Sequence, residues 1–163
     1  MLLQNKDIKL DNILVDVFVI SISHPLLIGV YENKQLIKTY EQEGKTSDIL
    51  PLIFEKILSE FRIKELYYVN SPGSYMAIKV AYVFLKTLAI TQHIKLKATF
   101  GFNFNNQTPI KALGKKYFIY ENKEIKIDFL HKDTILGEFK LPEMLDDAIF
   151  EAESLPKYNL PAV

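Results

Sequence analysis

The stretch that most limits the possible fold is residues 66–92, where a short strand, a tight turn and a long apolar helix are expected in succession. Residues 66–69 are aromatic and β-branched, which predicts a strand. In the turn that follows, Pro72 fixes φ, Gly73 permits a positive φ, and Ser74 can cap the next helix. We therefore expect a strand–turn–helix unit whose turn presents backbone N–H groups and a helix N-terminus to the outside.

The helix expected over residues 75–90 is apolar around most of its circumference, and only Lys79 and Lys86 fall together on one polar side. The residues opposite these lysines, which should meet a sheet, are Ala77, Ala81, Phe84 and Leu88. A surface helix needs an apolar stripe of a little over 100°, so the extra apolar flanks predict burial on a second side. In so small a chain we expect another subunit to provide that cover. The alternative is a central helix wrapped by its own domain.

Residues 71–81 run Ser-Pro-Gly-Ser-Tyr-Met-Ala-Ile-Lys-Val-Ala, which resembles the segment G-P-G-S-F-T-G-hydrophobic-R-hydrophobic-G of the bacterial TsaB (YeaZ) family. The matching positions are Pro72, Gly73 and Ser74, with Tyr75 for Phe and Lys79 for Arg. The departures are Ser71, Met76, Ala77 and Ala81, where the family favours Gly, Thr, Gly and Gly. Residues 46–51 resemble a second family segment, H-S-E-hydrophobic-L-P, without its His.

The resemblance covers residues 13–120 well and the remainder weakly. It implies an α/β protein with the actin-like ATPase (ribonuclease H-like) fold, in which helices flank a mixed sheet and the second half is reduced. It also implies a non-catalytic scaffold that pairs with TsaD in threonylcarbamoylation of the tRNA adenosine beside the anticodon. The implied partners are a TsaD-like subunit in a heterodimer, a TsaE-like ATPase in a larger complex, a second copy when alone, and tRNA only through the complex.

Hydrophobic periodicity and turn residues divide the rest of the chain into short elements. Before the long helix we expect strands at 13–22, 26–31 and 36–43 and a helix at 49–61. After it we expect a strand at 94–98, a loop at 99–109, a hairpin of 115–120 and 124–129, a strand at 134–140 and a helix at 141–150. The predicted domains are an N-terminal extension (1–12), an actin-like domain (13–98), and a reduced second subdomain with a C-terminal tail (99–163).

The helix at 49–61 also carries a wide apolar stripe at helical spacing. Two such helices could pack against two equivalent helices of a partner and form a four-helix contact. The residues expected at this interface are Leu50, Phe54, Ile57, Lys79, Tyr82, Val83, Lys86 and Ile90. In the loop at 99–109, three Phe residues are expected to anchor the loop to the core rather than to bind a ligand.

The residues of a catalytic site are not recognisable in this sequence. The three histidines, at 24, 93 and 131, are too far apart for a clustered zinc site. Actin-like ATPases carry an acidic residue followed by Gly and Thr at the end of the first strand, and residues 19–23 hold neither acid nor Gly. Asp16 lies earlier, inside the apolar run, and is expected to be a strand residue rather than a metal ligand. We therefore expect no enzyme activity, no cofactor and no metal.

Composition narrows the function classes further. The chain has no Cys, which excludes disulfides and thiolate chemistry, and its net charge of zero does not mark a free-standing nucleic-acid binder. It has no signal-peptide pattern and no membrane-length apolar run, so a cytoplasmic protein is expected. Two alternatives to the scaffold stay open. One is an independent nucleotide-binding or hydrolytic enzyme that uses the Pro72-Gly73-Ser74 turn as a phosphate cradle, and the other is a structural dimer without a link to tRNA.

Overall fold

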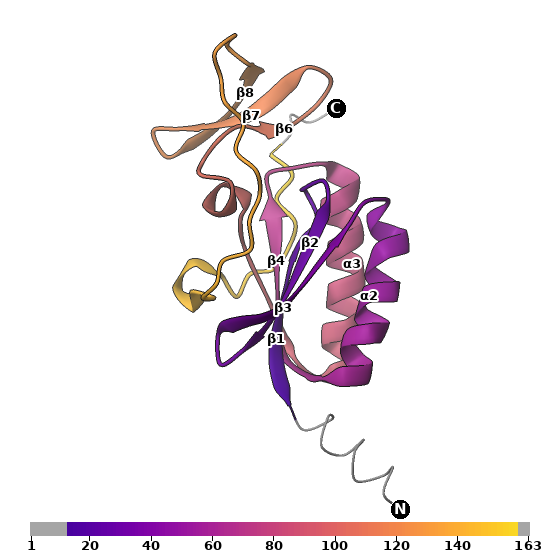
Figure 1. The fold of residues 1–163 in the computed structure, drawn as a ribbon. Helices are drawn as coiled ribbons and strands as arrows, with labels where there is room; N and C mark the ends of the chain where they lie inside the picture. The colour runs from indigo at the N-terminus through magenta and orange to yellow at the C-terminus, as the bar shows by residue number, and fades with distance from the viewer. Residues whose placement is uncertain (1–12, 160–163) are drawn as a thin grey trace, which may run out of the picture.

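A computed structural model describes residues 13–159, which form two sheets and two long helices (Figure 1). The expected N-terminal extension and the last four residues of the expected tail lie outside the described residues. The first sheet contains β1 (Leu14–Ile20), β2 (Leu26–Glu32), β3 (Gln35–Gln42), β4 (Arg62–Ser71) and β5 (Lys95–Phe100). The helices are α2 (Thr46–Glu60) and α3 (Tyr75–Gln92). The second, smaller sheet contains β6 (Ile110–Lys111), β7 (Lys116–Glu121) and β8 (Glu124–Phe129).

The five-stranded sheet has the order β3-β2-β1-β4-β5 and is mixed. β1 pairs antiparallel with β2, which pairs antiparallel with β3, so short turns suffice to connect these strands. β4 lies parallel to both β1 and β5, and parallel neighbours need long crossovers. α2 and α3 are these crossovers, and both cover the same face of the sheet (Figure 1). The expected mixed sheet flanked by helices is confirmed.

The strands of the sheet are apolar on both sides because both faces are covered. On the helix side, Val15, Val17 and Val19 of β1 pack with side chains of α2 and α3. On the other side, Phe18 and Ile20 pack against residues that follow the sheet in the sequence. Burial on two faces explains why β1 is an almost unbroken run of apolar residues rather than an alternating one.

The second face of the sheet is covered by residues that follow β5. Phe102 and Phe104, in the 3-10 helix η1 (Gly101–Phe104), are buried there with Phe118 of β7. These two Phe residues anchor the loop to the core as expected, whereas Phe100 remains 40% exposed. Described residues beyond position 98 therefore share one core with the five-stranded sheet.

The segment of residues 140–159, here called the strap, crosses the sheet and then follows the edge of β5. The Leu36 N–H donates to the Glu143 carbonyl at 2.8 Å, Ala98 and Glu151 exchange two backbone hydrogen bonds at 3.0 and 2.8 Å, and the Lys157 N–H donates to Asn70 at 3.0 Å. Residues 134–140 form no strand and residues 141–150 form no α-helix, so both of these predictions are wrong. The only helical turn in this range is the 3-10 helix η2 (Asp147–Ile149).

The reason for this error is visible in the burial of the strap. Its buried apolar residues, Leu145 and Phe150, are five positions apart, which places them on different sides of an α-helix. An extended strap can bury both, and its backbone groups find partners on β3 and β5 instead of within a helix.

α3 is rotated relative to the expectation by about one residue. Its fully buried residues are Ile78, Ala81, Leu85 and Ala89. Ala81 was therefore placed correctly, whereas Phe84 and Leu88 are half-buried on the flank towards α2. The ring of Phe84 lies 5.3 Å from that of Phe54 in α2. The expectation was inaccurate because α3 packs against the sheet and α2 together, so the middle of its buried arc is not opposite the lysines.

Candidate functional site

An apolar groove lies between α2 and α3 and has a volume of about 540 Å³. Leu50 and Pro51 of α2 form one wall, and Val80, Val83, Phe84 and Leu88 of α3 form the other. Its side chains are mostly apolar because both helices carry apolar residues beyond the stripes that face the sheet. An uncovered apolar groove of this kind is the usual mark of an interaction surface.

The exposure of the α3 side chains shows how much apolar surface is left uncovered. Met76 is 61% exposed, Val83 is 54% exposed, and Ile90 near the end of the helix is 64% exposed. Lys79 also lines the groove, and its ammonium group lies 5.5 Å from the ring centre of Tyr75. The long lysine stem can therefore lie along apolar surface while its charge stays at the rim.

The structure separates the expected interface residues into three groups. Lys79 and Val83 line the groove, and Leu50 forms part of its wall although the residue is buried. Phe54 and Ile57 are fully buried in the protein's own core, so the prediction that they contact a partner is wrong. Their stripe on α2 meets the sheet and α3, which leaves nothing for a partner to touch.

The three remaining predicted residues lie outside the groove wall. Tyr82 is half-buried and faces Tyr68, with ring centres 6.3 Å apart. Lys86 is half-buried and Ile90 is exposed. The groove residues that the prediction missed include Pro51, Met76 and Val80. The i, i+4, i+7 spacing of 76, 80 and 83 is the signal that could have identified the α3 wall.

The turn before α3 contains the motif Pro72-Gly73-Ser74. Ser74 is the N-cap of α3, and its hydroxyl accepts a hydrogen bond from the Ala77 N–H at 3.5 Å, as expected. The expectation of a positive φ at Gly73 is wrong, because the glycines with positive φ in the described residues are Gly44 and Gly114. Gly73 is required for a different reason: a Cβ atom there would lie 2.3 Å from Cγ2 of Ile22.

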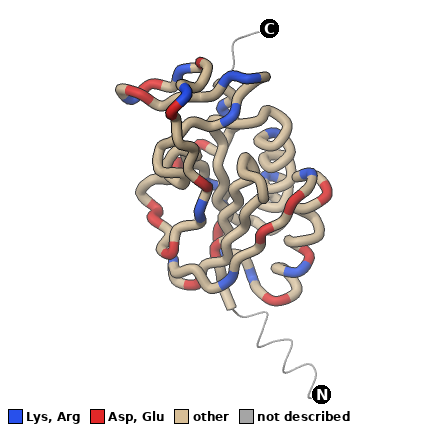
Figure 2. Tube along the Cα trace, turned by 45° about the horizontal axis from the view of Figure 1, so that its top comes forward, with Lys and Arg blue, Asp and Glu red and all other residues tan. Residues whose placement is uncertain are grey.

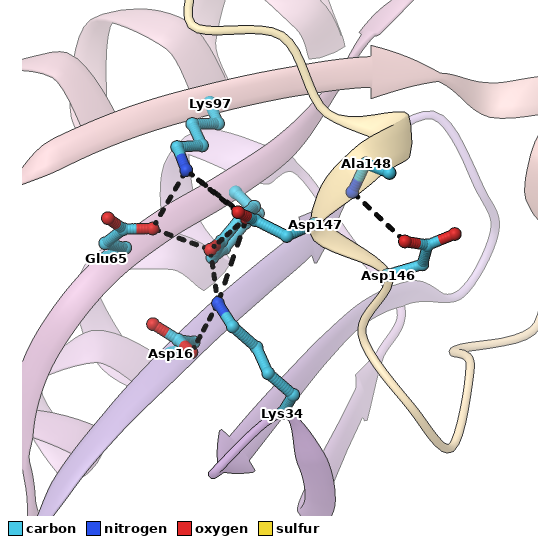
Figure 3. A network of polar contacts seen from close by, with 8 residues as sticks. Asp16, Lys34, Glu65, Lys97, Asp146, Asp147 and Ala148 are labelled. Carbon is cyan, nitrogen blue, oxygen red and sulfur yellow. Dashed lines mark hydrogen bonds and ion pairs between the residues drawn. The ribbon is translucent and has the colours of Figure 1, made fainter.

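The opposite face of the sheet holds a network of charged side chains around Tyr67, here called the ionic cluster (Figure 3). It consists of Asp16, Lys34, Glu65, Tyr67, Lys97 and Asp147. The Lys34 ammonium group lies 3.1 Å from Asp16 and donates to the Tyr67 hydroxyl at 2.7 Å. Lys97 bridges Glu65 at 3.3 Å and Asp147 at 3.2 Å. The cluster therefore joins β1, β4 and β5 to the strap.

The protonation states in the ionic cluster favour a clamp rather than acid–base chemistry. Hydrogen bonds from Tyr67 and Lys97 lower the pKa of the Asp147 carboxyl against a smaller opposing effect of burial. Burial by itself would raise the pKa of Glu65, but hydrogen bonds with Tyr67 and Lys97 outweigh it and the pKa is lowered. The Tyr67 hydroxyl has one proton, so it donates to Glu65 or to Asp147 at any one time. Burial and the neighbouring carboxylates raise the pKa of Tyr67. At neutral pH the two carboxyls are thus ionised and the phenol is protonated.

The remaining candidate ligands are scattered. Asp16 lies within β1 as expected and is 4% exposed. His24 and His131 are exposed, and His93 follows the last turn of α3. Within residues 13–159, no group of three or more His, Cys, Asp or Glu side chains is placed to hold a metal ion. Among the helices in that range, none has the length and apolar character needed to cross a bilayer.

Comparisons with known proteins place this arrangement in a wider context. No family model matches the sequence, and no curated protein does. Among solved structures, the chain resembles YeaZ from Pseudomonas aeruginosa with a TM-score of 0.56 at 10% sequence identity, covering 82% of this chain and 72% of that one. It also resembles a structure described as an uncharacterized protein with similarity to peptidase YeaZ from Pseudomonas aeruginosa. There the TM-score is 0.53 at 10% identity, and the coverage is 70% of this chain and 63% of the other. These likenesses establish the actin-like, ribonuclease H-like fold that the TsaB resemblance implied.

Proposed function

We propose that this chain is a TsaB-like accessory subunit, a non-catalytic cytoplasmic scaffold that pairs with a TsaD-like subunit in the threonylcarbamoyladenosine modification of tRNA. The observation that carries the proposal is the apolar groove between α2 and α3. The YeaZ-like fold and the residues of the 71–81 segment are the reasons for proposing a TsaD-like subunit as the partner.

The chemistry of the groove fits a protein partner better than a small polar ligand. Sites for nucleotides and other polar molecules combine an apolar cavity with several convergent polar groups. Here the walls are mostly aliphatic and aromatic, and Lys79 is the one charged residue among them. Four hydroxyl side chains also line the groove, but those of Thr87 and Thr91 donate to carbonyls of their own helix, at Val83 and Leu88. A second pair of apolar helices, from the TsaD-like subunit or from another copy of the chain, would cover Met76 and Val83 in a four-helix contact.

Two observations favour the scaffold over a nucleotide-binding enzyme that uses the Pro72-Gly73-Ser74 turn. The space beside Gly73 is filled by Ile22, so no phosphate can approach the backbone there from that side. Two hydrogen-bond donors next to the turn already have partners: the Ser21 hydroxyl donates to the Ala77 carbonyl at 3.1 Å, and the Ala77 N–H donates to the Ser74 hydroxyl at 3.5 Å.

The remaining alternative, a structural dimer without a link to tRNA, uses the same groove and differs only in its occupant. We propose that the chain pairs with itself when alone and that the TsaD-like subunit replaces the second copy. A TsaE-like ATPase would join the larger complex, and tRNA would be bound only through that complex.

The test replaces Val83, which is 54% exposed in the groove wall, with Glu. We expect Val83→Glu to abolish pairing with the TsaD-like subunit, because the contact would bury a carboxylate without a partner at a cost of several kcal/mol. Light scattering after size-exclusion chromatography measures the pairing, and circular dichroism measures folding. The matched control is Leu52→Glu, which places the same charge at a 62% exposed position of α2 outside the groove.

Each outcome has a distinct meaning. Loss of pairing in Val83→Glu alone, with folding intact, supports the proposal. If both variants pair like the unchanged protein, the groove is not the interface. If the unchanged protein forms only its own dimer and never binds the TsaD-like subunit, the structural-dimer alternative is correct.

A further inference from the structure

One long stretch of the chain contains basic residues but no acidic ones. The whole sequence is neutral, with 20 basic and 20 acidic side chains, but residues 66–120 contain no Asp or Glu. The lysines in this stretch are Lys79, Lys86, Lys95 and Lys97, followed by Lys111, Lys115 and Lys116. A neutral total therefore conceals a strongly basic segment, and charge asymmetry of this kind is typical of a surface for a polyanion.

The fold gathers three of these lysines at the connection between β6 and β7, here called the hairpin tip (residues 111–117). Lys111 is the last residue of β6, and Lys115 and Lys116 follow Gly114, which has a φ of +57°. All three lysines are exposed, and none of the ion pairs within residues 13–159 involves them. Figure 2 shows both blue and red segments in the small sheet at the top of that view. The acidic residues of this sheet, Glu121, Glu124 and Asp128, belong to β7 and β8 and not to the hairpin tip.

The groups around the hairpin tip are those that bind nucleic acid. Lys111 lies opposite the half-exposed Tyr117 in the β6–β7 pairing, and the Lys116 ammonium group lies 5.5 Å from the ring centre of Phe129. The loop that leads into β6 adds exposed amide side chains, among them Asn106 and Gln107. Lysines and amides bond phosphate and sugar oxygens, and aromatic rings stack on bases. A membrane surface would match the lysines but not the amides.

The hairpin tip also lies close to the proposed partner interface. Ile110 at the start of β6 belongs to the same buried cluster as Ile22 and as Ile78 in the first turns of α3. Met76 and Lys79, which flank Ile78 in the sequence, line the groove. In Figure 1 the β6–β7 connection lies at the same end of the molecule as the start of α3. A polyanion on the tip would thus lie beside a subunit bound in the groove.

We propose that the hairpin tip contacts the RNA on which the modification complex acts, with its three lysines on the phosphate backbone and Tyr117 against a base. This inference rests on the proposed function, because the RNA reaches the chain through the complex. It assigns an RNA-binding role to residues of this chain rather than to its partner alone.

The test compares two triple variants with the same change of charge, each in complex with the TsaD-like subunit. The tip variant is Lys111→Gln, Lys115→Gln and Lys116→Gln. The control is Lys56→Gln, Arg62→Gln and Lys64→Gln, at exposed positions on α2 and β4 outside the basic stretch of residues 66–120. None of these three side chains forms an ion pair among the described residues. The dissociation constant for fluorescently labelled tRNA is measured from about 50 to about 200 mM salt, the range over which released counterions dominate the affinity.

We expect the tip variant to bind tRNA about tenfold more weakly than the unchanged complex at the lowest salt concentration. We also expect the slope of log K against log[salt] to become smaller by about 2, because each lost phosphate contact reduces the slope by about 0.7–0.9. The control should stay within about twofold of the unchanged complex. Tyr117→Ala should weaken binding without changing the slope, because stacking releases no counterions. Light scattering establishes that each variant still pairs with the TsaD-like subunit.

The contrary outcomes separate the two proposals. If the unchanged chain does not pair with the TsaD-like subunit, the proposed function fails and this inference fails with it. If pairing is intact but the tip and control variants bind tRNA equally well, the inference alone is wrong. If the tip variant keeps its tRNA affinity and instead loses binding to vesicles containing phosphatidylserine, the tip is a membrane contact and the RNA assignment is overturned.

Discussion

Gly73 offers the sharpest test of how the turn is built, because the structure attributes its role to a close approach and not to an unusual backbone angle. A Cβ atom at this position would lie 2.3 Å from Cγ2 and 2.9 Å from Cβ of Ile22. Carbon atoms pack at about 3.5–4.0 Å, so Gly73→Ala requires the turn and the segment after β1 to separate by about 1 Å. Overpacking of this kind typically costs about 1–3 kcal/mol.

The partner mutation Ile22→Ala removes the closest atom while leaving the 2.9 Å Cβ contact. It should be destabilising alone, because Ile22 is 8% exposed in the core of the second sheet face. In combination with Gly73→Ala, however, the added methyl group enters the space that the Ile side chain vacates. We therefore expect the double variant to be more stable than the sum of the single effects predicts, by about 1 kcal/mol or more.

The assay is urea unfolding followed by circular dichroism for the four proteins of the cycle. Gly114→Ala serves as a control, because Gly114 has a φ of +57° and a Cβ there would meet nothing within 4 Å. Gly114→Ala should lower the free energy of unfolding by about 1 kcal/mol through backbone strain. This loss should add to the loss caused by Ile22→Ala. Additive effects of Gly73→Ala and Ile22→Ala would refute the close-approach explanation.

Two further predictions concern the ionic cluster and ATP hydrolysis. The pKa values of Asp147 and Glu65 are lowered on folding from ordinary values of 3.8 and 4.5, so their contribution to stability is complete above about pH 5 and is lost as the pH falls through the folded values. Asp147→Asn should therefore flatten the fall in thermal stability between about pH 5 and pH 3, and an unchanged acid limb in differential scanning calorimetry would contradict this. The purified chain should not hydrolyse ATP in a coupled assay, and steady turnover that Asp16→Ala abolishes would support the enzyme alternative instead.

Local sequence patterns were sufficient to predict the elements in the first two thirds of the chain. The β-branched run of β1, the cap at Ser74 and the helical stripe of α2 each determine one element through interactions between near neighbours. The TsaB resemblance then predicted that these elements form a mixed sheet flanked by helices. The order in which the strands pair was not predicted, because local patterns do not encode it. The expected hairpin of β7 and β8 was also correct, with a turn at Asn122 and Lys123.

The parts that were mispredicted depend on contacts between residues distant in sequence. The strap is extended because its backbone bonds to β3 and β5, more than 50 residues away from Glu151 in the case of Ala98. Phe54 and Ile57 were assigned to a partner because a helical wheel cannot say whether an apolar stripe meets the same chain or another. The apolar circumference of α3 was enough to predict an interaction surface on this helix. The residues that form the groove depend on how α2 packs against α3, which the sequence pattern does not show.

The strap has a consequence for the order in which the protein acquires its structure during synthesis. The sheet and both helices are complete by residue 100, yet Phe18 and Tyr67 on the far face are covered by residues that include Phe104 and Phe150. While translation proceeds at roughly 5–20 residues per second, that apolar face stays open for several seconds. A nascent chain stalled before the strap emerges would expose it to other chains. Chaperones that bind apolar strands should therefore associate with stalled chains that end near residue 130 and release those that extend past the strap.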